Sequence, residues 1–260
     1  MRKNRIMRIT GLMHVILLFL IPVQLLSQSV SDNGIQQQLT LQAIHHNTID
    51  GLLLKNPAEA NTVRFIYNIS RQTIKRKTFF NAAYERGKFK DNSSLMTQYS
   101  FSFILSDGLN IIPKSKNFSA YLGYSLNSNP SFGTSENIYS WNSSSLLSFY
   151  QLYEYKINKQ AISFSIDIPV AGAIYRPKQV YASGDKNFNK VVSTFYSNPS
   201  FASLHNFEAV DLSLMYKVNI SRHFTVVAEY SFGYKKWTGT SAFTDKSHGA
   251  GLSLIYKLFK

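Results

Sequence analysis

The chain has 260 residues, of which 44% are hydrophobic, 14% are aromatic and only 16% are charged. This balance excludes an intrinsically disordered chain, which needs few aromatics and high charge, and a coiled coil, which needs abundant Ala, Glu, Lys and Leu. The sequence has no cysteine, so disulfides, thiolate zinc sites and cysteine nucleophiles are also excluded. The formal net charge is +14, and its meaning depends on where the basic residues lie.

Residues 1–27 have the three parts of a secretory signal peptide: a basic start, an apolar run from Val15 to Val23, and a short tail that ends at Ser27. The apolar run is shorter than the roughly 20 residues of a membrane-spanning helix, and Pro22 interrupts it. We therefore expect export and cleavage before Gln28. An uncleaved inner-membrane anchor is the alternative.

From Val63 onward, apolar and polar residues alternate with period two, as in strands whose two faces meet different surroundings. The clearest case is Phe224 to Lys236, where only Val227 departs from the polar face. The nine alternating segments are 63–69, 80–84, 99–105, 118–124, 147–155, 162–168, 210–218, 224–234 and 250–258. Many are long enough for the roughly 9 to 11 residues with which a tilted strand crosses a bilayer.

The links between these segments alternate in length. On one side lie the short links 71–73, 158–160 and 221–223 and the somewhat longer 107–116, and on the other side lie 89–94, 127–141, 177–203 and 238–246, the third of which exceeds two dozen residues. Short turns on one rim and long loops on the other are typical of outer-membrane barrels. A secreted soluble β-sandwich, the alternative, predicts no such asymmetry.

Strand parity predicts one further strand. A chain that enters from the periplasm and ends there needs an even number of strands, so a tenth must precede Val63. The only material is Gln36 to Leu54, whose alternation is poor, and a periplasmic tail or a partial plug is the alternative for it. The sequence thus predicts an all-β fold, an antiparallel up-and-down transmembrane β-barrel with ten strands expected and between eight and twelve allowed. The expected domains are the signal peptide 1–27, the N-terminal segment 28–61 and the barrel 62–260.

The signal peptide, the alternating strands and an aromatic residue near the C-terminus, Phe259, together resemble a bacterial outer-membrane β-barrel protein. The resemblance covers about residues 36–260 and is a pattern rather than a specific motif. It implies residence in the bacterial outer membrane, contact with outer-membrane lipids and insertion by the barrel-assembly machinery. A monomer is favoured, and no cofactor is expected.

If the apolar faces meet lipid, the residues of opposite parity face the lumen. Three carboxylates, Asp167, Asp211 and Glu229, then lie on successive strands, and the link 221–223 predicts nearly the same height for Asp211 and Glu229. The expected basic partners are Lys217, Arg64 and Lys235. We expect these groups to neutralise one another in a network that fills a narrow barrel. A cation path or a reaction site is the alternative.

Histidine residues offer little for catalysis. A membrane hydrolase needs a nucleophile and a base, and His248 with Ser247 or Ser241 is the best pair, although adjacent residues on a strand point apart. The pair His45 and His46 could bind a metal, but no further ligand falls at a suitable spacing, so a solvated pair is expected. No catalytic, cofactor or metal site is predicted, and an outer-membrane hydrolase acting on lipid or peptide is the alternative.

Aromatic residues are expected to form two belts at the headgroup level of the membrane. The periplasmic belt comprises Tyr67, Phe118, Tyr155, Tyr216, Phe224 and Tyr256, and the outer belt comprises Tyr84, Tyr99, Tyr124 and Tyr234. The basic cluster Arg71, Lys75, Arg76 and Lys77 lies at a short turn, where it suits lipid phosphates better than nucleic acid. The expected function is passive transport, lipid contact or envelope structure without catalysis.

Overall fold

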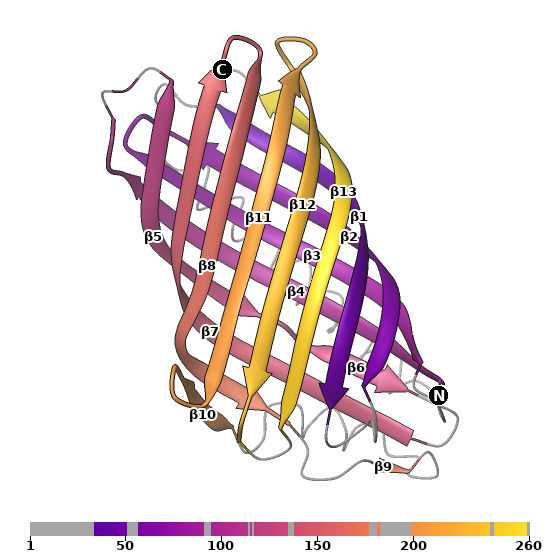
Figure 1. Ribbon diagram of the computed structural model, residues 1–260. Helices are drawn as coiled ribbons and strands as arrows, with labels where there is room; N and C mark the ends of the chain where they lie inside the picture. The colour runs from indigo at the N-terminus through magenta and orange to yellow at the C-terminus, as the bar shows by residue number, and fades with distance from the viewer. Residues whose placement is uncertain are drawn as a thin grey trace, which may run out of the picture.

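A computed structural model describes residues 34–50, 57–90, 95–113, 115, 117–134, 138–176, 181–182, 199–239 and 242–258 of the chain. Its main feature is a closed antiparallel β-barrel of ten long strands (Figure 1). The predicted fold class and strand number are therefore confirmed. The expected signal peptide lies outside the described residues.

The ten barrel strands follow one another around the wall in chain order. They are β1 (Ile35–Asp50), β2 (Ala58–Gln72), β3 (Arg76–Lys90), β4 (Leu95–Asn110), β5 (Phe118–Ser128), β7 (Ile138–Ile157), β8 (Gln160–Tyr175), β11 (Phe207–Asn219), β12 (Phe224–Trp237) and β13 (Phe243–Leu258). Three short strands, β6 (Ser131–Thr134), β9 (Tyr181–Ala182) and β10 (Ser200–Ser203), extend the wall.

The barrel closes between its first and last strands. β1 pairs with β13 along its whole length, from Ile35 opposite Leu258 to Asp50 opposite Phe243. Residues 36–50 of the doubtful segment therefore belong to the tenth strand, and their poor alternation did not prevent pairing, because the backbone hydrogen bonds of a ladder form whatever the side chains are. A closed wall also rules out the β-sandwich alternative, which consists of two separate sheets.

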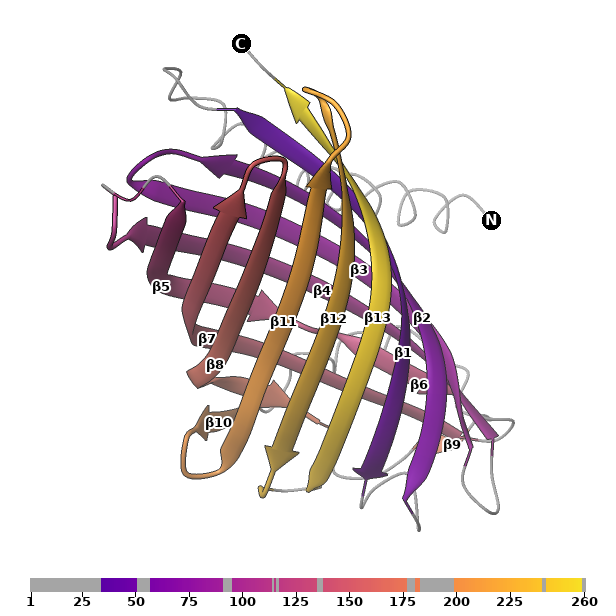
Figure 2. The same ribbon diagram turned by 45° about the horizontal axis from the view of Figure 1, so that its top comes forward.

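The strands are strongly tilted. A path that starts at Glu154 on β7 and moves from each residue to its Cα partner on the next strand goes once around the barrel, crossing β6 between β4 and β7. It returns to β7 at Asn142, twelve residues from its start. A stagger of this kind corresponds to a strand tilt of about 35–45° in closed barrels. The slanted strands are visible in Figures 1 and 2.

The two ends of the barrel carry different links, although the link from β4 to β5 at one end is longer than that from β3 to β4 at the other. Short turns join β2 to β3, β4 to β5, β7 to β8 and β11 to β12 at the top of Figure 1, which we call the short-turn end. The tightest is the two-residue link after Ile157, where Asn158 has a positive φ of 52°, a conformation that Asn tolerates better than most residues. The opposite end, where β12 joins β13, is called the long-loop end.

One predicted loop is largely strand. Residues 127–141 were expected to form a long loop, but β5 continues to Ser128, β6 follows, and β7 already begins at Ile138. This stretch is rich in Ser and Asn and lacks apolar alternation. Its ladders form nonetheless, because pairing beyond the lipid does not require an apolar face.

The outward faces of the strands are apolar, as the alternation predicts. Leu39, Phe65, Leu214, Leu252 and Leu254 are all exposed, and Leu252 retains 67% of its accessible surface. Within the described residues, no helix is long and apolar enough to cross a membrane. An exterior of this kind suits contact with hydrocarbon rather than water.

Candidate functional site: the barrel lumen

The inside of the barrel contains a cavity of about 420 Å³. Side chains from all ten barrel strands line it, and six of them are the charged residues that the sequence predicts to face inward. These six are Asp167, Asp211, Glu229, Lys217, Arg64 and Lys235. Alternation along each strand puts them inside because their sequence neighbours face outward.

Asp167 on β8 and Asp211 on β11 are direct Cα partners, so their side chains start side by side on the inner wall. Asp211 has a basic neighbour, with its Oδ2 atom 3.8 Å from Nζ of Lys235. Asp167 instead accepts hydrogen bonds from the Ser125 hydroxyl and from Nδ2 of Asn127, the latter at 3.2 Å. No described Lys or Arg forms an ion pair with Asp167.

Glu229 on β12 lies apart from this pair. The turn between β11 and β12 is centred on Arg222, so the residue opposite Asp211 is Gly233, four positions beyond Glu229. The expectation that Asp211 and Glu229 share one height is therefore wrong, and the difference is about 13 Å along the strand. Glu229 accepts a hydrogen bond from the Ser213 hydroxyl at 3.1 Å, and no described side chain forms an ion pair with it.

Two of the three expected bases have other partners. Arg64 lies opposite Glu85 on β3 and donates to its Oε2 atom from Nε at 2.8 Å and from Nη2 at 2.6 Å. Lys217 donates to Oε1 of Glu154 at 3.0 Å. Only Lys235 contacts one of the three predicted acids. The network is thus built of local pairs rather than of one central cluster.

His46 is buried, and the expectation of a solvated histidine pair is wrong for it. Its Nε2 lies 2.6 Å from Oε1 of Glu85, and its Nδ1 lies 3.3 Å from Oδ1 of Asp245. Thr62 and Thr48 each donate a hydrogen bond at 2.6 Å, to Glu85 and Asp245 respectively. Because a carboxylate only accepts, each ring nitrogen is placed to donate, which is the arrangement of an imidazolium.

His45 faces the outside of the barrel. Its ring stacks on that of His248 with centroids 5.9 Å apart, and its Nδ1 lies 3.0 Å from Oδ1 of Asn61. The two adjacent histidines therefore point to opposite faces and cannot share a ligand. No group of three or more His, Asp or Glu side chains in the described ranges has the geometry to hold a metal ion.

The expected Ser and His pair is separated in the same way. Ser247 lines the lumen, whereas His248 lies outside against His45. Ser247 is instead the Cα partner of His46, whose ring nitrogens both face carboxylates. Ser241 lies outside the described residues.

The short-turn end of the lumen contains a lysine that the sequence analysis assigned to the wrong face. Lys77 was expected at the rim among residues facing lipid phosphates, but the parity of β3 turns its side chain inward, where it lines the cavity. Its neighbour Arg76 faces the other way and pairs with Asp107 at 2.5 Å. The alternation that follows on β3 indicates this orientation, because Phe80 and Tyr84 share the outward face and Lys77 has the opposite parity.

The long-loop end is narrowed by large side chains. Arg176 donates from Nη2 to both carboxylate oxygens of Asp50, at 2.7 and 2.8 Å, and lies over the ring of Phe243. The sequence missed both residues for different reasons: the alternation was followed on β8 only to Ile168, and the segment 36–54, which contains Asp50, alternates too poorly to assign faces.

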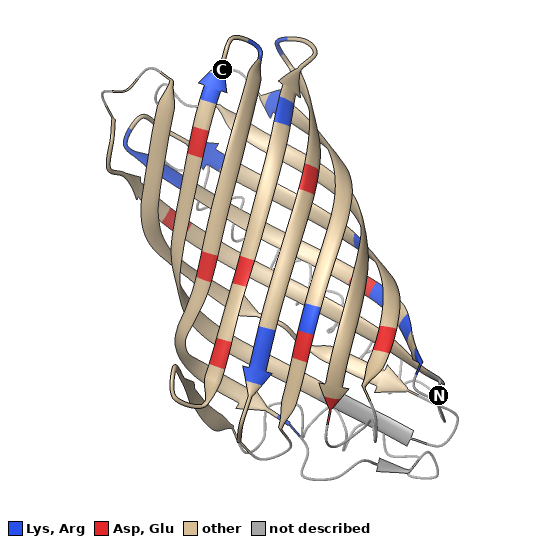
Figure 3. Ribbon diagram, viewed as in Figure 1, with Lys and Arg blue, Asp and Glu red and all other residues tan. Residues whose placement is uncertain are grey.

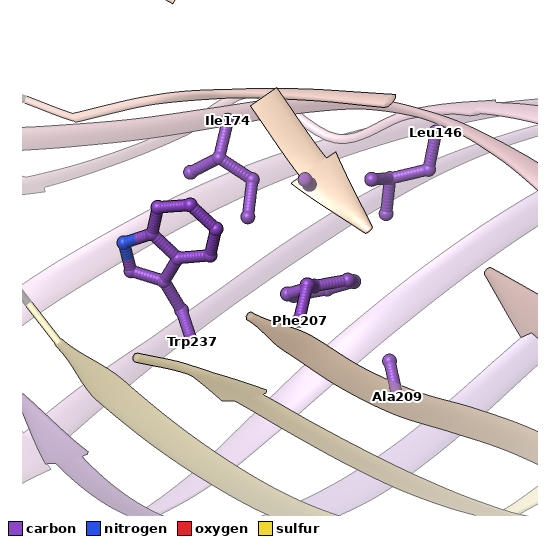
Figure 4. Close-up of a cluster of buried hydrophobic side chains, with 6 residues drawn as sticks. Leu146, Ile174, Phe207, Ala209 and Trp237 are labelled. Carbon is purple, nitrogen blue, oxygen red and sulfur yellow. The ribbon is translucent and has the colours of Figure 1, made fainter. Parts of the chain in front are cut away.

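Beside this pair lies an apolar cluster centred on Trp237 (Figure 4). Trp237 is buried against Phe207, Ile174 and Leu146. Two of its neighbours, Phe207 and Ile174, also line the cavity. The cluster therefore restricts the lumen at this end.

None of the ten predicted belt aromatics lines the lumen cavity. Five of them, Tyr124, Tyr155, Tyr216, Phe224 and Tyr256, are exposed. Phe118 is the partner of Tyr155, and Phe224 is the partner of Tyr256, all close to the short-turn end. Tyr124 lies opposite Asp107, three residues from the short-turn end of β4, although it was assigned to the outer belt.

No protein-family model matches the sequence, and no characterised protein matches it. Solved structures do match its fold. The outer-membrane protease OmpT from Escherichia coli is 8% identical, with a TM-score of 0.58 over 89% of this chain and 99% of that one. The translocator domain of the autotransporter NalP from Neisseria meningitidis is 9% identical, with a TM-score of 0.45 over 91% and 92% of the two chains.

An outer-membrane channel from Pseudomonas putida F1 is 6% identical, with a TM-score of 0.42 over 88% of this chain and 97% of that one. At these identities a likeness concerns the fold alone, and only the TM-score with OmpT is high enough to support an argument. The closed antiparallel wall and the apolar exterior of this chain are typical of outer-membrane barrels. The chain has the fold of bacterial outer-membrane β-barrels.

Proposed function

We propose that the protein is a narrow outer-membrane channel through which small hydrophilic solutes pass passively. The observation that carries the proposal is the cavity of about 420 Å³, which has both polar and apolar lining and to which all ten barrel strands contribute residues. Its lining runs from Gln36 and Lys77 near the short turns to Asp50 and Asp245 near the long loops. A barrel that served only as a membrane anchor would not need a cavity with polar lining along its length.

The unpaired carboxylates support a hydrated lumen. Asp167 and Glu229 face the cavity, and neither forms an ion pair with a described residue. A carboxylate without a cation is tolerated inside a protein only when water, a proton or a ligand compensates it. Water in the lumen therefore accounts for both residues, and a hydrated lumen is the first requirement of a channel.

The proposed location is the bacterial outer membrane, after export by a cleaved signal peptide. Outer-membrane lipids would cover the apolar exterior, and the barrel-assembly machinery would insert the chain. We propose a monomer, because a barrel that pairs its first strand with its last has no free sheet edge.

The lumen suits a channel better than a hydrolase. A general base must be free to take a proton from the nucleophile. His46, the histidine next to Ser247, has carboxylates at both ring nitrogens, so it lacks a free acceptor position. An enzyme of this architecture would have to break one of these contacts before it could act.

Single-channel recording in a planar bilayer tests the proposal. Folded protein should give discrete conductance steps that grow with salt concentration, and liposomes containing it should swell in small sugars more than in large ones. The same preparation after boiling, which unfolds the barrel and changes its migration on a gel, is the control. Folded protein that gives neither steps nor swelling would refute the channel and favour an envelope-structural or lipid-contact role.

A further inference from the structure

Charge is distributed unevenly along the lumen. Near the short turns, four lysines, Lys77, Lys156, Lys217 and Lys257, gather around the single carboxylate Glu154. The surplus of three positive charges in this group contrasts with the carboxylates farther along the lumen. Figure 3 shows several Lys and Arg residues at this end, at the top of the view, and others near the lower end of β12, with Asp and Glu spread along the strands.

Glu154 neutralises only part of this group. It is almost fully buried, accepts a hydrogen bond from Lys217 at 3.0 Å and lies 3.5 Å from Nζ of Lys156. Lys257 donates to Oδ1 of Asn219 at 2.5 Å, which is a neutral partner. Two of the four lysines, Lys156 and Lys217, thus contact Glu154. No described carboxylate forms an ion pair with Lys77 or Lys257.

Lys77 is the most informative member. Only 9% of its surface is exposed, it lines the cavity, and it has no hydrogen bond or ion pair to another described side chain. Its Nζ lies 5.9 Å from the centre of the Tyr121 ring. A buried ammonium that lacks a partner is costly unless an anion or water compensates it. Its free donors therefore point to a ligand.

The surroundings of Lys77 form a built pocket rather than an open surface. Tyr121 is fully buried and fixed by a hydrogen bond from Nε2 of Gln72 at 2.8 Å. Tyr150 packs edge-on against Phe79 with ring centroids 5.3 Å apart, and both line the cavity beside Lys77. Aromatic walls exclude water from one side, which strengthens the attraction between an anion and the lysines.

We propose that Lys77 and Lys217 hold a small soluble oxyanion, such as inorganic phosphate, at the short-turn end of the lumen. Ammonium groups bind phosphate oxygens through charge-assisted hydrogen bonds, and a surplus of positive charge raises the local concentration of anions. Both lysines line the cavity, on the side of the wall opposite the lipid-facing surface. The occupant is therefore a free anion and not the headgroup of a bilayer lipid.

This inference deepens the proposed channel, but it can be tested without it. Isothermal titration of inorganic phosphate into the folded barrel, in a detergent without phosphate, should show saturable binding to one site. Lys77→Met should weaken that binding about tenfold or more, because a charge-assisted hydrogen bond is lost. Lys77→Arg should retain most of it. Lys235→Met is the matched control, since it removes a lumen lysine from the acidic part and should leave phosphate binding unchanged.

No binding by the native barrel, or equal affinities of the native, Lys77→Met and Lys235→Met proteins, would overturn the anion site. Gel migration before and after boiling verifies that each variant is folded. In planar bilayers, phosphate should also reduce the conductance of the native protein and not that of Lys77→Met. If titration shows the site while no conductance is seen, the channel proposal fails and the anion site stands. If conductance is seen without phosphate binding, the anion site fails and the channel proposal stands.

Discussion

Asp167 and Asp211 occupy directly opposed positions on two neighbouring strands, and both line the lumen. Like charges placed opposite each other destabilise a sheet and raise the cost of ionising both groups. Lys235, 3.8 Å from Asp211, offsets only part of this repulsion. The pair is therefore better explained by contact with water and cations in the lumen than by a contribution to stability.

Asp211→Asn should lower the permeability of the channel to cations relative to anions. One negative charge of the pair is removed, while the barrel should still fold and migrate differently on a gel before and after boiling. The reversal potential in a salt gradient measures this relative permeability. Glu208→Gln is the matched control, because Glu208 lies on the same strand but on the outer face, 3.5 Å from Lys236. A folded Asp211→Asn protein with the native reversal potential would exclude this carboxylate from the ion path.

Leu214→Arg and Leu254→Arg should each destabilise the barrel by about 2 to 4 kcal/mol if the residue lies near the bilayer midplane. Both leucines are exposed on the outer face, where hydrocarbon cannot solvate a guanidinium. Ser213→Arg should destabilise the barrel less, because Ser213 faces the lumen and donates a hydrogen bond to Glu229. Equal folding yields of all three variants in lipid vesicles would contradict the assignment of the faces.

The nine alternating strands could be predicted because lipid on one side and a polar lumen on the other impose period two on the sequence. Phe224 to Lys236 has this pattern almost without exception and forms β12. β6 and the first residues of β7 lie in the predicted loop 127–141, where Ser and Asn pair through the backbone and give no alternation. Strand ends beyond the lipid are therefore the part of the fold that the pattern misses.

The inward direction of the charged residues was also predictable, but their partners were not. Parity fixes the face of a residue, whereas its neighbours depend on register, and the turn centred on Arg222 places Gly233 rather than Glu229 opposite Asp211. His46 was missed for a related reason. Its contacts come from two different strands: Glu85 lies on β3, beyond β2, and Asp245 lies on β13, which barrel closure places beside β1.

Trp237→Ala should widen the long-loop end of the lumen and raise the single-channel conductance. The indole is 3% exposed and packs in the cluster that restricts this end. Its removal should also lower the free energy of unfolding by about 3 to 5 kcal/mol, because a cavity remains. Phe201→Ala is the control, since this ring is 70% exposed and its loss should change neither quantity appreciably. A native conductance in the folded Trp237→Ala protein would show that the cluster does not limit passage.

His46→Leu should lower the free energy of unfolding by about 3 to 5 kcal/mol, because it removes the cationic partner of two carboxylates. Glu85 would keep Arg64 at 2.6 Å, but Asp245 would keep only the hydroxyl of Thr48 as a close hydrogen-bond donor among the described side chains. Unfolding in urea from lipid vesicles measures the loss.

His45→Leu is the matched control on the same strand. His45 faces outward and stacks on His248, so its replacement should change stability by less than about 0.5 kcal/mol. His46→Leu should still give conductance steps in the folded fraction, since His46 lines the cavity but a leucine in its place leaves the cavity open. Equal stability of the two variants would show that the contacts of His46 with Glu85 and Asp245 do not stabilise the barrel, and lost conductance would place His46 in the solute path.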